Sequence, residues 1–586
     1  MKISRSPSLA VLATAFAVTF QAVGPAMART DLQDDVETTV SGSYLAARFA
    51  SSERDNDAAI THLRNLLKLD ADNPEVVERT FIATLVDGQI DDAVALARRL
   101  VEIDSNNRLA RLTLGVNAMR KKHYRTARSN LALSVSGPIG DLTATLLAGW
   151  SFLGSGQPKN ATTVIERLKG PEWYGGLKAL NAGLILQVAG KDKEAGKLLR
   201  QAAELDPNSL RAVEAYARWV SRNEDPKAAL AIFNALDSRL QRHPMVKQQT
   251  ALLESGKTLP AMVTTPQQGA AQVLYDLGTL LARQGGEDLA LVYLQLATWL
   301  NPEHPFGYLT LAELYEQLKQ PEKAIAAYRL VPASSPMKRE AEIQLAVNLD
   351  ATDKFDEAQE HLKALVASQP DDPDAIIALG RIQQGRKKFA ECADSYASAI
   401  KLIKTPGQSN WPLFYLHGIC NERAENWPTA EASLKKALEL EPDQPHVLNY
   451  LGYSWVDQGI HLDEGLGMIR KAVALRPDDG PIVDSLGWAY YRLGRYQEAV
   501  DELEHAVELM PQDPVLNDHL GDAYWKVGRK LEAGFQWNHA RDLKPEPDVL
   551  EKIEKKIKLG LDAAEAPAPV KKAEDVKKTD DSSAPR

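Results

Sequence analysis

Residues that could perform catalysis or bind a metal are present, but their spacing does not suit that chemistry. The eleven histidines are scattered singly along the chain. Glu360-His361 and Glu504-His505 are adjacent pairs, but neither continues into the His-Glu-x-x-His pattern, which places two zinc ligands on one turn of a helix. The sequence therefore predicts neither a metal site nor a zinc-activated water.

Patterns for nucleophilic catalysis and phosphate binding are also missing. Gly149, Ser151, Gly154 and Gly156 lie close together, but they do not form a Gly-x-Ser-x-Gly elbow, and no predicted strand leads into them. Glycine-rich phosphate loops follow strands as well. We therefore predict that the chain is not an enzyme and needs no cofactor.

Composition narrows the class of protein further. The chain has 586 residues, of which 44% are hydrophobic and 25% charged, as in ordinary folded proteins. It carries 69 basic and 79 acidic residues, a formal net charge of −10. Nucleic-acid binding is not expected, because neutralising phosphates requires a basic surface.

The first residues are typical of a secretory signal. A basic start with Lys2 and Arg5 precedes an apolar run over 9–23, and Ala26-Met27-Ala28 offers a small-x-small cleavage site. We expect residues 1–28 to be removed, which leaves a periplasmic or secreted chain without a membrane span. An uncleaved anchor is the alternative. No cysteine lies near the cleavage site to carry a lipid.

The positions of small residues reveal the architecture that must hold any binding site. A small residue on a helical pattern recurs at steps close to 34, and we call these positions the reference residues. The first series, with Phe81 at one place, is Ala47, Phe81, Gly115, Gly149, Gly183 and Ala217; the later series are Gly278, Ala312, Ala346 and Gly380, and Gly418, Gly452, Gly487 and Gly521.

Other residues repeat with the same period. Alanine recurs twelve and nineteen positions after the reference residue, as in Ala499 and Ala506, and proline recurs twenty-four positions after it, as in Pro511. Such spacing predicts two helices of about 13 residues per unit, which approach closely at small residues and end at proline. No segment alternates with the period of a strand. We predict an all-α fold.

These repeats resemble the tetratricopeptide repeat. The resemblance covers about fourteen units and implies a right-handed α-solenoid of helical hairpins with an interruption in mid-chain. The predicted parts are a signal peptide (1–28), an N-terminal array of about six repeats (40–244), a half repeat and linker (245–270), a C-terminal array of about eight repeats (271–545), a capping helix (546–561) and a disordered tail (562–586). We expect the solenoid to bend at the half repeat.

Cys392 falls where the repeat requires a small residue, and Cys420 falls on the first helix of a unit. Two cysteines cannot form a disulfide framework or complete a zinc site unaided. We therefore expect two packed, structural thiols.

The resemblance also implies a binding groove, because the first helix of each unit lines the concave face in this family. Its pattern points four residues of each first helix inward. In the last four units these are Tyr415, Ile419, Glu422 and Arg423; Asn449, Tyr453, Val456 and Asp457; Asp484, Trp488, Tyr491 and Arg492; and Asp518, Asp522, Trp525 and Lys526.

Aromatic side chains such as Trp488 and Tyr491 give large contact areas at small entropic cost, although they also serve to fill the space between units. The aspartates suit a peptide with basic or amide groups, or else belong to a solvated face. Relatives that clamp acidic tails use lysine and arginine, so Asp484 and Asp518 have the wrong sign for that role. A second candidate surface is a basic patch in the third unit, formed by Arg108, Arg111, Lys121, Lys122 and Arg125.

The function implied is that of a non-catalytic scaffold or adaptor that binds proteins or peptides, with one partner in each array. Some periplasmic relatives deliver substrates to a C-terminal-processing envelope protease. The alternative is a component of an exopolysaccharide or outer-membrane secretion and assembly apparatus.

Overall fold

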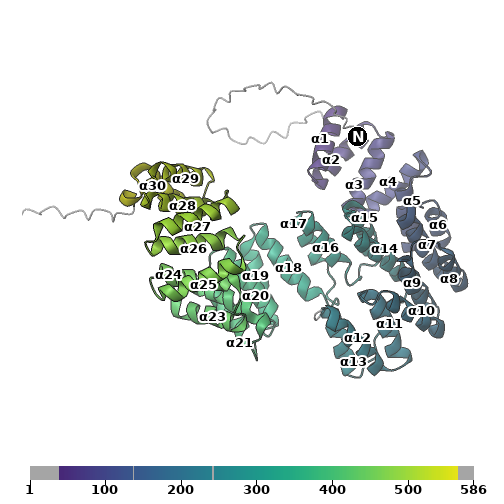
Figure 1. Ribbon diagram of the computed structural model, residues 1–586. Coiled ribbons are helices and arrows are strands. Elements are labelled where there is room, and N and C mark those ends of the chain that lie inside the picture. The colour runs from purple at the N-terminus through teal and green to yellow at the C-terminus, as the bar shows by residue number, and fades with distance from the viewer. Residues whose placement is uncertain (1–38, 136, 241–242, 565–586) are drawn as a thin grey trace, which may run out of the picture. The chain divides into compact units, whose positions relative to one another are not determined.

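The computed structural model of the chain describes residues 39–135, 137–240 and 243–564. The predicted signal peptide lies outside these residues. The described part contains helices and no strand (Figure 1), which confirms the all-α prediction. The chain divides into one compact unit that ends at Thr113 and another that begins at Leu114.

The first unit contains α1 and α2 (Val40–Ser52, Asn56–Leu69), α3 and α4 (Pro74–Val86, Ile90–Ile103) and the start of α5 (Arg108–Arg120). The second unit continues with α6 (Tyr124–Leu131), α7 and α8 (Gly137–Gly154, Pro158–Arg167), α9 and α10 (Tyr174–Val188, Asp192–Leu205), α11 and α12 (Leu210–Asn223, Pro226–Leu240) and α13 (Pro244–Glu254).

The later helices are α14 and α15 (Pro266–Arg283, Glu287–Leu300), α16 and α17 (Gly307–Gln317, Pro321–Arg329), α18 and α19 (Lys338–Ala351, Phe355–Ser368), α20 and α21 (Pro373–Gly385, Phe389–Lys401), the 3-10 turn η1 (Gln408–Asn410), α22 and α23 (Trp411–Arg423, Trp427–Leu440), α24 and α25 (Pro445–Asp457, Leu462–Leu475), α26 and α27 (Gly480–Arg492, Tyr496–Leu509), α28 and α29 (Pro514–Lys526, Lys530–Asp542), α30 (Pro547–Leu559) and α31 (Leu561–Ala564).

Every reference residue lies on the first helix of a pair, from Ala47 on α1 to Gly521 on α28. Asp513 and Asp479 cap the first helices α28 and α26 by accepting hydrogen bonds from free backbone amides. Gly494 takes the positive φ of 75° that the turn between α26 and α27 requires. The local sequence thus defines where each helix begins and ends.

The paired helices touch at the reference residues. A Cβ atom added to Gly487 would lie 2.5 Å from Leu503 Cγ, and one added to Gly418 would lie 2.7 Å from Leu434 Cγ. The alanines twelve and nineteen positions later, such as Ala499 and Ala506, are fully buried. Small residues are therefore necessary where the two helices of these units cross.

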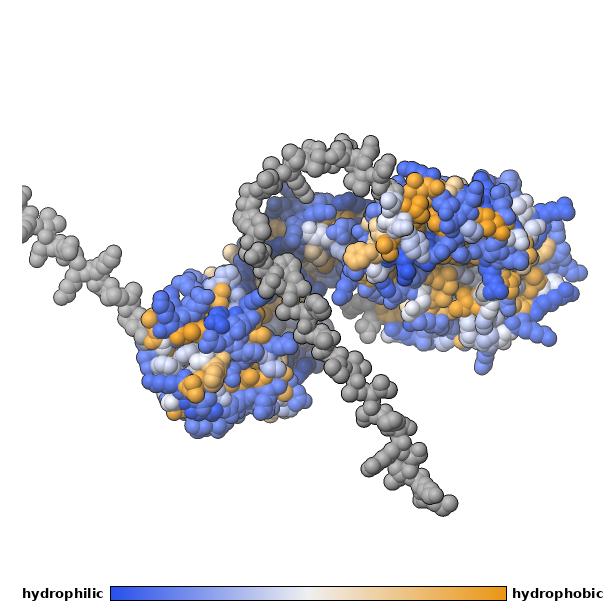
Figure 2. Space-filling view, turned by 90° about the horizontal axis from the view of Figure 1, so that it is seen from above, coloured by the Kyte–Doolittle hydropathy of each residue, from blue (hydrophilic) through white to orange (hydrophobic). Residues whose placement is uncertain are grey.

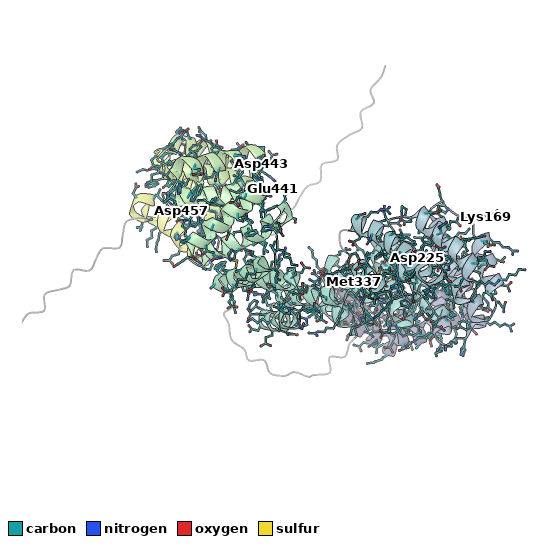
Figure 3. All side chains as sticks on the ribbon, turned by 90° about the horizontal axis from the view of Figure 1, so that it is seen from below. Lys169, Asp225, Met337, Glu441, Asp443 and Asp457 are labelled. Atoms are coloured by element: carbon teal, nitrogen blue, oxygen red, sulfur yellow. A yellow bond between two sulfur atoms is a disulfide. The ribbon has the colours of Figure 1, made fainter. Side chains whose placement is uncertain are left out.

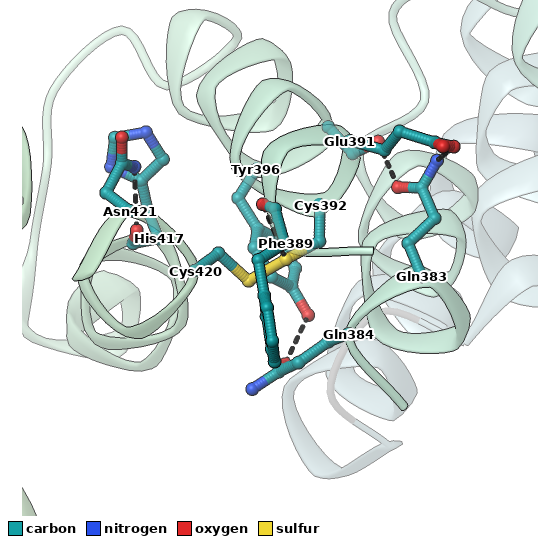
Figure 4. The surroundings of a disulfide bond; sticks show 10 residues. Gln383, Gln384, Phe389, Glu391, Cys392, Tyr396, His417, Cys420 and Asn421 are labelled. Atoms are coloured by element: carbon teal, nitrogen blue, oxygen red, sulfur yellow. Dashed lines mark hydrogen bonds between the residues drawn. A yellow bond between two sulfur atoms is a disulfide. The ribbon is translucent and has the colours of Figure 1, made fainter. Parts of the chain in front are cut away.

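The two cysteines form a disulfide, which corrects the expectation of free thiols. Cys392 on α21 and Cys420 on α22 are bonded and fully buried beside Tyr396 (Figure 4). The bond joins the second helix of one unit to the first helix of the next, across the four-residue insertion in the repeat. Stacking brings the two positions together although 28 residues separate them.

The interruption in mid-chain brings α14 back onto the preceding array. After the single helix α13, the chain passes through residues 255–265, and α14 then packs against α7 and α9 (Figure 1). A Cβ atom on Gly269 would lie 2.3 Å from the ring of Trp150, so the glycine backbone rests directly on the indole. At the half repeat, where we predicted a bend, α14 therefore packs against helices of the preceding array.

Polar side chains fix this arrangement of α14. Gln267 Nε2 donates to Met119 O at 3.0 Å and to Tyr124 Oη at 3.1 Å. The buried guanidinium of Arg211 donates to Gln272 Oε1, which also lies 3.2 Å from His304 Nε2. Hydrogen bonds as well as apolar contacts therefore hold α14 against the preceding helices.

At the C-terminal end, α30 coincides with the predicted capping helix. The tail predicted as disordered from 562 lies outside the described residues except for 562–564, which belong to α31, so helical structure extends further than predicted. The other predicted domain boundaries stay predictions. No described helix is long and apolar enough to cross a membrane. On the face in Figure 2, apolar residues form scattered patches among hydrophilic ones.

Gly487→Ala should destabilise the array by about 1–3 kcal/mol, because the new methyl group would overlap Leu503. Gly467→Ala is the matched control. No atom lies within 4 Å of the Cβ position of this helical glycine, so alanine there should be neutral or stabilise by up to about 1 kcal/mol. Thermal unfolding followed by circular dichroism measures both variants. Equal stability of the two would contradict helix contact at the reference residue.

Candidate functional site

The predicted groove residues lie on α22, α24, α26 and α28, at the positions three before and one after each reference residue. We call these the inner positions. Tyr415, Ile419, Asn449, Tyr453 and Trp488 are partly exposed, whereas Asp484, Asp518 and Asp522 are buried. The inner positions therefore divide into an open section on α22 and α24, which continues to Trp488 on α26, and a covered section on α28.

The acidic residues of α28 are covered by the terminal helix of the same chain. Lys556 Nζ on α30 donates to Asp518 Oδ2 at 2.8 Å and to Asp522 Oδ2 at 2.7 Å. The other oxygen of Asp522 accepts from Trp537 Nε1 at 2.9 Å. The basic group that the sequence predicts for a bound peptide is here supplied by α30.

Burial governs protonation at this contact. Burial raises the pKa of Asp522 to about 6, although the ammonium of Lys556 acts to lower it. Burial lowers the pKa of Lys556, but Asp522 and Asp518 outweigh that effect and hold the pKa above its usual value. The ammonium group of Lys556 is thus ion-paired with both buried carboxylates, Asp518 and Asp522.

Beside this contact, Asp484 orients a stack of three rings. His519 Nδ1 lies 3.0 Å from both carboxylate oxygens of Asp484. Burial lowers the pKa of His519, but Asp484, together with Asp518 and Asp522, outweighs burial, and the net pKa lies above the usual value. Trp488 stacks on His519 with ring centroids 4.0 Å apart and on Tyr491 at 4.6 Å. Trp488 is thus held between neighbouring rings and remains partly exposed.

The open section combines aromatic and polar groups. The rings of Tyr415 and Tyr450 meet edge to face at 5.9 Å, and Tyr450 Oη donates to Glu422 Oε2 at 2.8 Å. Burial raises the pKa of Tyr453 to about 12, so its hydroxyl stays protonated.

The side-chain oxygen of Asn449 on α24 accepts no hydrogen bond. Its Nδ2 donates to Ser485 Oγ at 3.0 Å. The hydroxyl of Ser485 in turn donates to Pro481 O, so Oγ can only accept, and this fixes the orientation of the amide. Asn449 Oδ1 is therefore a buried acceptor that lacks a donor.

The other predicted residues lie at the edges of the groove or beneath it. Asp457, labelled in Figure 3, is ion-paired with Arg492 at the ends of α24 and α26. Arg423 is exposed and Val456 is buried. Trp525 Nε1 and Lys526 Nζ both donate to Asp562, each at 2.9 Å. Trp525 is thus held by the residues that follow α30.

Sequence reasoning missed three residues that define the groove: His519, Tyr450 and Lys556. His519 and Tyr450 lie two residues before a reference residue, where the family pattern assigns no inward side chain. Charge could have indicated the contact of Lys556 with α28. The helix α30 carries several lysines, and α28 carries two aspartates one turn apart. Within the described ranges, no group of three or more His, Cys, Asp and Glu residues is arranged to hold a metal ion.

Family models match several segments of the C-terminal array. Tetratricopeptide repeat models match residues 307–331, 343–408, 421–480 and 487–528. These segments of the C-terminal array are therefore tetratricopeptide repeats, a fold that is typically a non-catalytic scaffold for protein–protein interactions.

Among curated proteins, the chain is similar to a BBSome complex member, the BBS4 homolog of Drosophila melanogaster. The identity is 25% over 273 residues, which cover 46% of this chain and 50% of that protein. A TPR repeat-containing protein of Dictyostelium discoideum is 27% identical over 143 residues and 52% of its length. The chain thus spans about half the length of the curated relatives that it matches.

Solved structures show similarity at low sequence identity. The APC/C hetero-tetramer Cut9-Hcn1 matches with 13% identity and a TM-score of 0.35 over 88% of this chain and 96% of that chain. Yeast Tom70 matches with 12% identity and a TM-score of 0.33 over 89% of this chain and 95% of that chain.

Lys556→Met should lower the free energy of unfolding by about 3 kcal/mol at pH 8, because two buried carboxylates lose their cation. The loss should be smaller at pH 5. The folded pKa of Asp522 already exceeds its unfolded value, so protonation favours folding as the pH falls below about 6. Denaturant unfolding at the two pH values measures the difference. Lys552→Met, at an exposed position on α30, is the control, and an equal loss at both pH values would argue against the buried contact.

Proposed function

We propose that the chain is a non-catalytic scaffold or adaptor, which binds other polypeptides on the inner face of α22, α24 and α26. One observation carries the proposal: Tyr415, Asn449 and Tyr453 remain partly exposed at the inner positions, while the equivalent positions on α7 and α9 are buried. An exposed aromatic surface flanked by polar groups is typical of a protein interface.

The chemistry of the open section suits a polypeptide ligand. Tyr415 and Trp488 are held by ring contacts, so they lose little entropy when a partner covers them. Asn449 and the ion pair of Asp457 with Arg492 supply polar contacts around them. The BBSome complex member in Drosophila is, by its name, part of a protein assembly, in agreement with this role.

The packing of α14 limits where the N-terminal array could hold the partner predicted for it. The inner positions of α7 and α9 are covered by α14, so that face cannot hold a second partner while α14 is packed there. The scaffold we propose therefore has its binding groove in the C-terminal array.

The proposal includes an extracytoplasmic location, in the periplasm or outside the cell. The signal-like start at residues 1–28 favours export. The Cys392–Cys420 disulfide suits an oxidising compartment, because cytosolic thiols are generally kept reduced. In that setting, the partner we propose is a substrate that the chain delivers to an envelope protease. A component of an exopolysaccharide or outer-membrane secretion apparatus is the alternative.

Tyr453→Ala should weaken capture of partner polypeptides from envelope extract by about tenfold, because truncating a central aromatic removes a large part of the contact energy. Phe535→Ala is the control, since this aromatic is 65% exposed on α29, away from the inner positions. Quantitative pull-down with mass spectrometry measures capture and identifies the partner. A protease with its substrates supports the adaptor, and export components support the alternative. Unchanged capture by Tyr453→Ala would contradict the groove.

Export can be tested on the protein isolated from its own cells. We expect an intact mass that begins near Arg29, with no thiol labelled under denaturing, non-reducing conditions and both cysteines labelled after reduction. A mass that retains residues 1–28 together with two free thiols would contradict the proposed compartment.

A further inference from the structure

The second helix of each pair carries a charge near its start that changes sign along the chain. The second residue of this helix is acidic in six pairs: Asp57, Asp91, Asp288, Glu322, Asp356 and Asp463. In four consecutive pairs the residue is basic: Arg125 on α6, Lys159 on α8, Lys193 on α10 and Lys227 on α12. No other second helix in the described ranges has a basic residue at this place. We call these four residues the basic row.

The stability of the helices does not explain the basic row. The N-terminus of a helix carries a partial positive charge, so an acidic side chain in the first turn stabilises the helix and a cation destabilises it. All four side chains are exposed, and none of them forms an ion pair with another described residue. Each residue of the basic row therefore opposes the helix that carries it without a compensating contact inside the chain.

The charge around the first half of the basic row is also positive. Between residues 114 and 169 the chain has eight lysines and arginines but two acidic residues, although its net charge is −10. Lys121 and Lys122, which belong to the basic patch predicted from sequence, directly precede α6 and are exposed. On α10 and α12 the basic row has acidic neighbours, which are Asp192, Glu194, Glu224 and Asp225. The positive charge is thus most concentrated at the starts of α6 and α8.

Arg128 on α6 shows that this charge is not neutralised within the described residues. Its guanidinium donates to Ser151 O at 3.0 Å and to Ser155 Oγ at 2.8 Å, and both acceptors are neutral. Burial lowers the pKa of Arg128, and the charge of Arg125 lowers it further. Several arginines of the C-terminal array are instead paired with carboxylates. The cations of α6 therefore repel one another and lack a counter-charge.

Contacts between neighbouring pairs place the basic row along one edge of the solenoid. Ser155 lies in the turn from α7 into α8, and Ser151 Oγ donates at 2.7 Å to the carbonyl of Tyr124, the first residue of α6. Trp219 lies near the end of α11, which leads into α12, and its Nε1 donates at 2.9 Å to the carbonyl of Asp192, the first residue of α10. At both places a second helix begins beside the turn into the next one. This edge is separate from the inner positions, which lie on first helices.

The composition of this edge favours a membrane surface over a protein as its partner. No large apolar side chain is exposed in the described turns before α6, α8, α10 and α12 or in the first two turns of these helices. Protein interfaces have an apolar or aromatic core and are poor in lysine. A bilayer with anionic phospholipids requires charge alone, and groups of about four to eight lysines and arginines bind such a surface.

From this pattern of charge we infer that the edge formed by Lys121, Lys122 and the basic row binds the surface of a membrane that contains anionic phospholipids. The ammonium and guanidinium groups contact the lipid phosphates. The contact is electrostatic, so the chain binds peripherally and more weakly as the salt concentration rises. It does not depend on the proposed binding of polypeptides at the inner positions.

Vesicle sedimentation tests the inference with the chain from Arg29 to Arg586, which lacks the apolar run of the predicted signal. One set of vesicles contains about one third phosphatidylglycerol in phosphatidylcholine, and the other contains phosphatidylcholine alone. Salt is raised from about 0.05 M to about 0.5 M, which shortens the screening length about threefold. We expect binding to the anionic vesicles at low salt, release at high salt and no binding to phosphatidylcholine. Equal binding to both sets, or to neither, would overturn the inference.

Reversing two charges of the basic row tests its part in the contact. Each basic residue contributes about fivefold to partitioning onto an anionic surface, so Arg125→Glu/Lys159→Glu should weaken binding about 25-fold or more. Thermal unfolding of this variant should be unchanged or shifted upward, because glutamate suits the first turn of a helix. The control Lys404→Glu/Lys552→Glu makes the same change in net charge at exposed residues elsewhere and should weaken binding less than about twofold. Equal losses in the two variants would contradict the assignment to the basic row.

A soluble polyanion separates a membrane from an acidic polypeptide as the ligand. Fluorescein-labelled polyglutamate presents negative charge without a lipid surface, and fluorescence anisotropy measures its binding. At equal concentrations of negative charge, we expect the chain to bind the anionic vesicles more tightly than polyglutamate. Tighter binding of polyglutamate, weakened by Arg125→Glu/Lys159→Glu, would overturn the membrane as partner and indicate an acidic polypeptide.

Discussion

The close approach of two helices at one small residue is the contact on which the whole solenoid depends. At Gly418 and Gly487 the first helix leaves no room for a Cβ atom against a leucine of the second. Each hairpin buries only one side of itself, so it must stack on the next hairpin to complete a core. Repetition of this contact brings the first helices side by side, and their exposed faces become a continuous inner surface.

That inner surface is used differently along the second unit of the chain. Leucines and Trp150 line it at α7 and α9, where α14 covers them. Aspartates line it at α28, where Lys556 of α30 neutralises part of their charge. Between these covered regions, the open section on α22 and α24 presents tyrosines and Asn449. The solenoid thus closes its inner surface at α7, α9 and α28 and leaves the aromatic section on α22 and α24 open to a partner.

The positions of the paired helices were predictable from the sequence, because each repeat carries the small residues that mark them. The reference residues locate the first helices, and the buried alanines such as Ala499 locate the second. The inner positions at Asp484 and Trp488 followed from the family pattern, although the pattern could not tell which would be covered. The half repeat marked the place where the stack is interrupted, but not the helix that packs back there.

The contacts that escaped prediction join residues distant in sequence. Cys392 and Cys420 stand at different positions of adjacent units, and only stacking across the four-residue insertion brings them within bonding distance. Gly269 on α14 and Trp150 on α7 lie on opposite sides of the interruption, and neither is unusual by itself. Lys556 is one of several lysines on α30, and burial against α28 distinguishes it from the others. Long-range packing, which a helical period does not encode, decides these contacts.

The central claim is that the inner face of the C-terminal array is open to partners while that of α7 and α9 is not. Site-specific photo-crosslinking in the native cell tests it directly, with benzoylphenylalanine placed at Tyr453 in one strain and at Trp150 in another. The account predicts crosslinks to another polypeptide from Tyr453, and crosslinks within the chain, to α14, from Trp150. Intermolecular crosslinks from Trp150 but none from Tyr453 would contradict it.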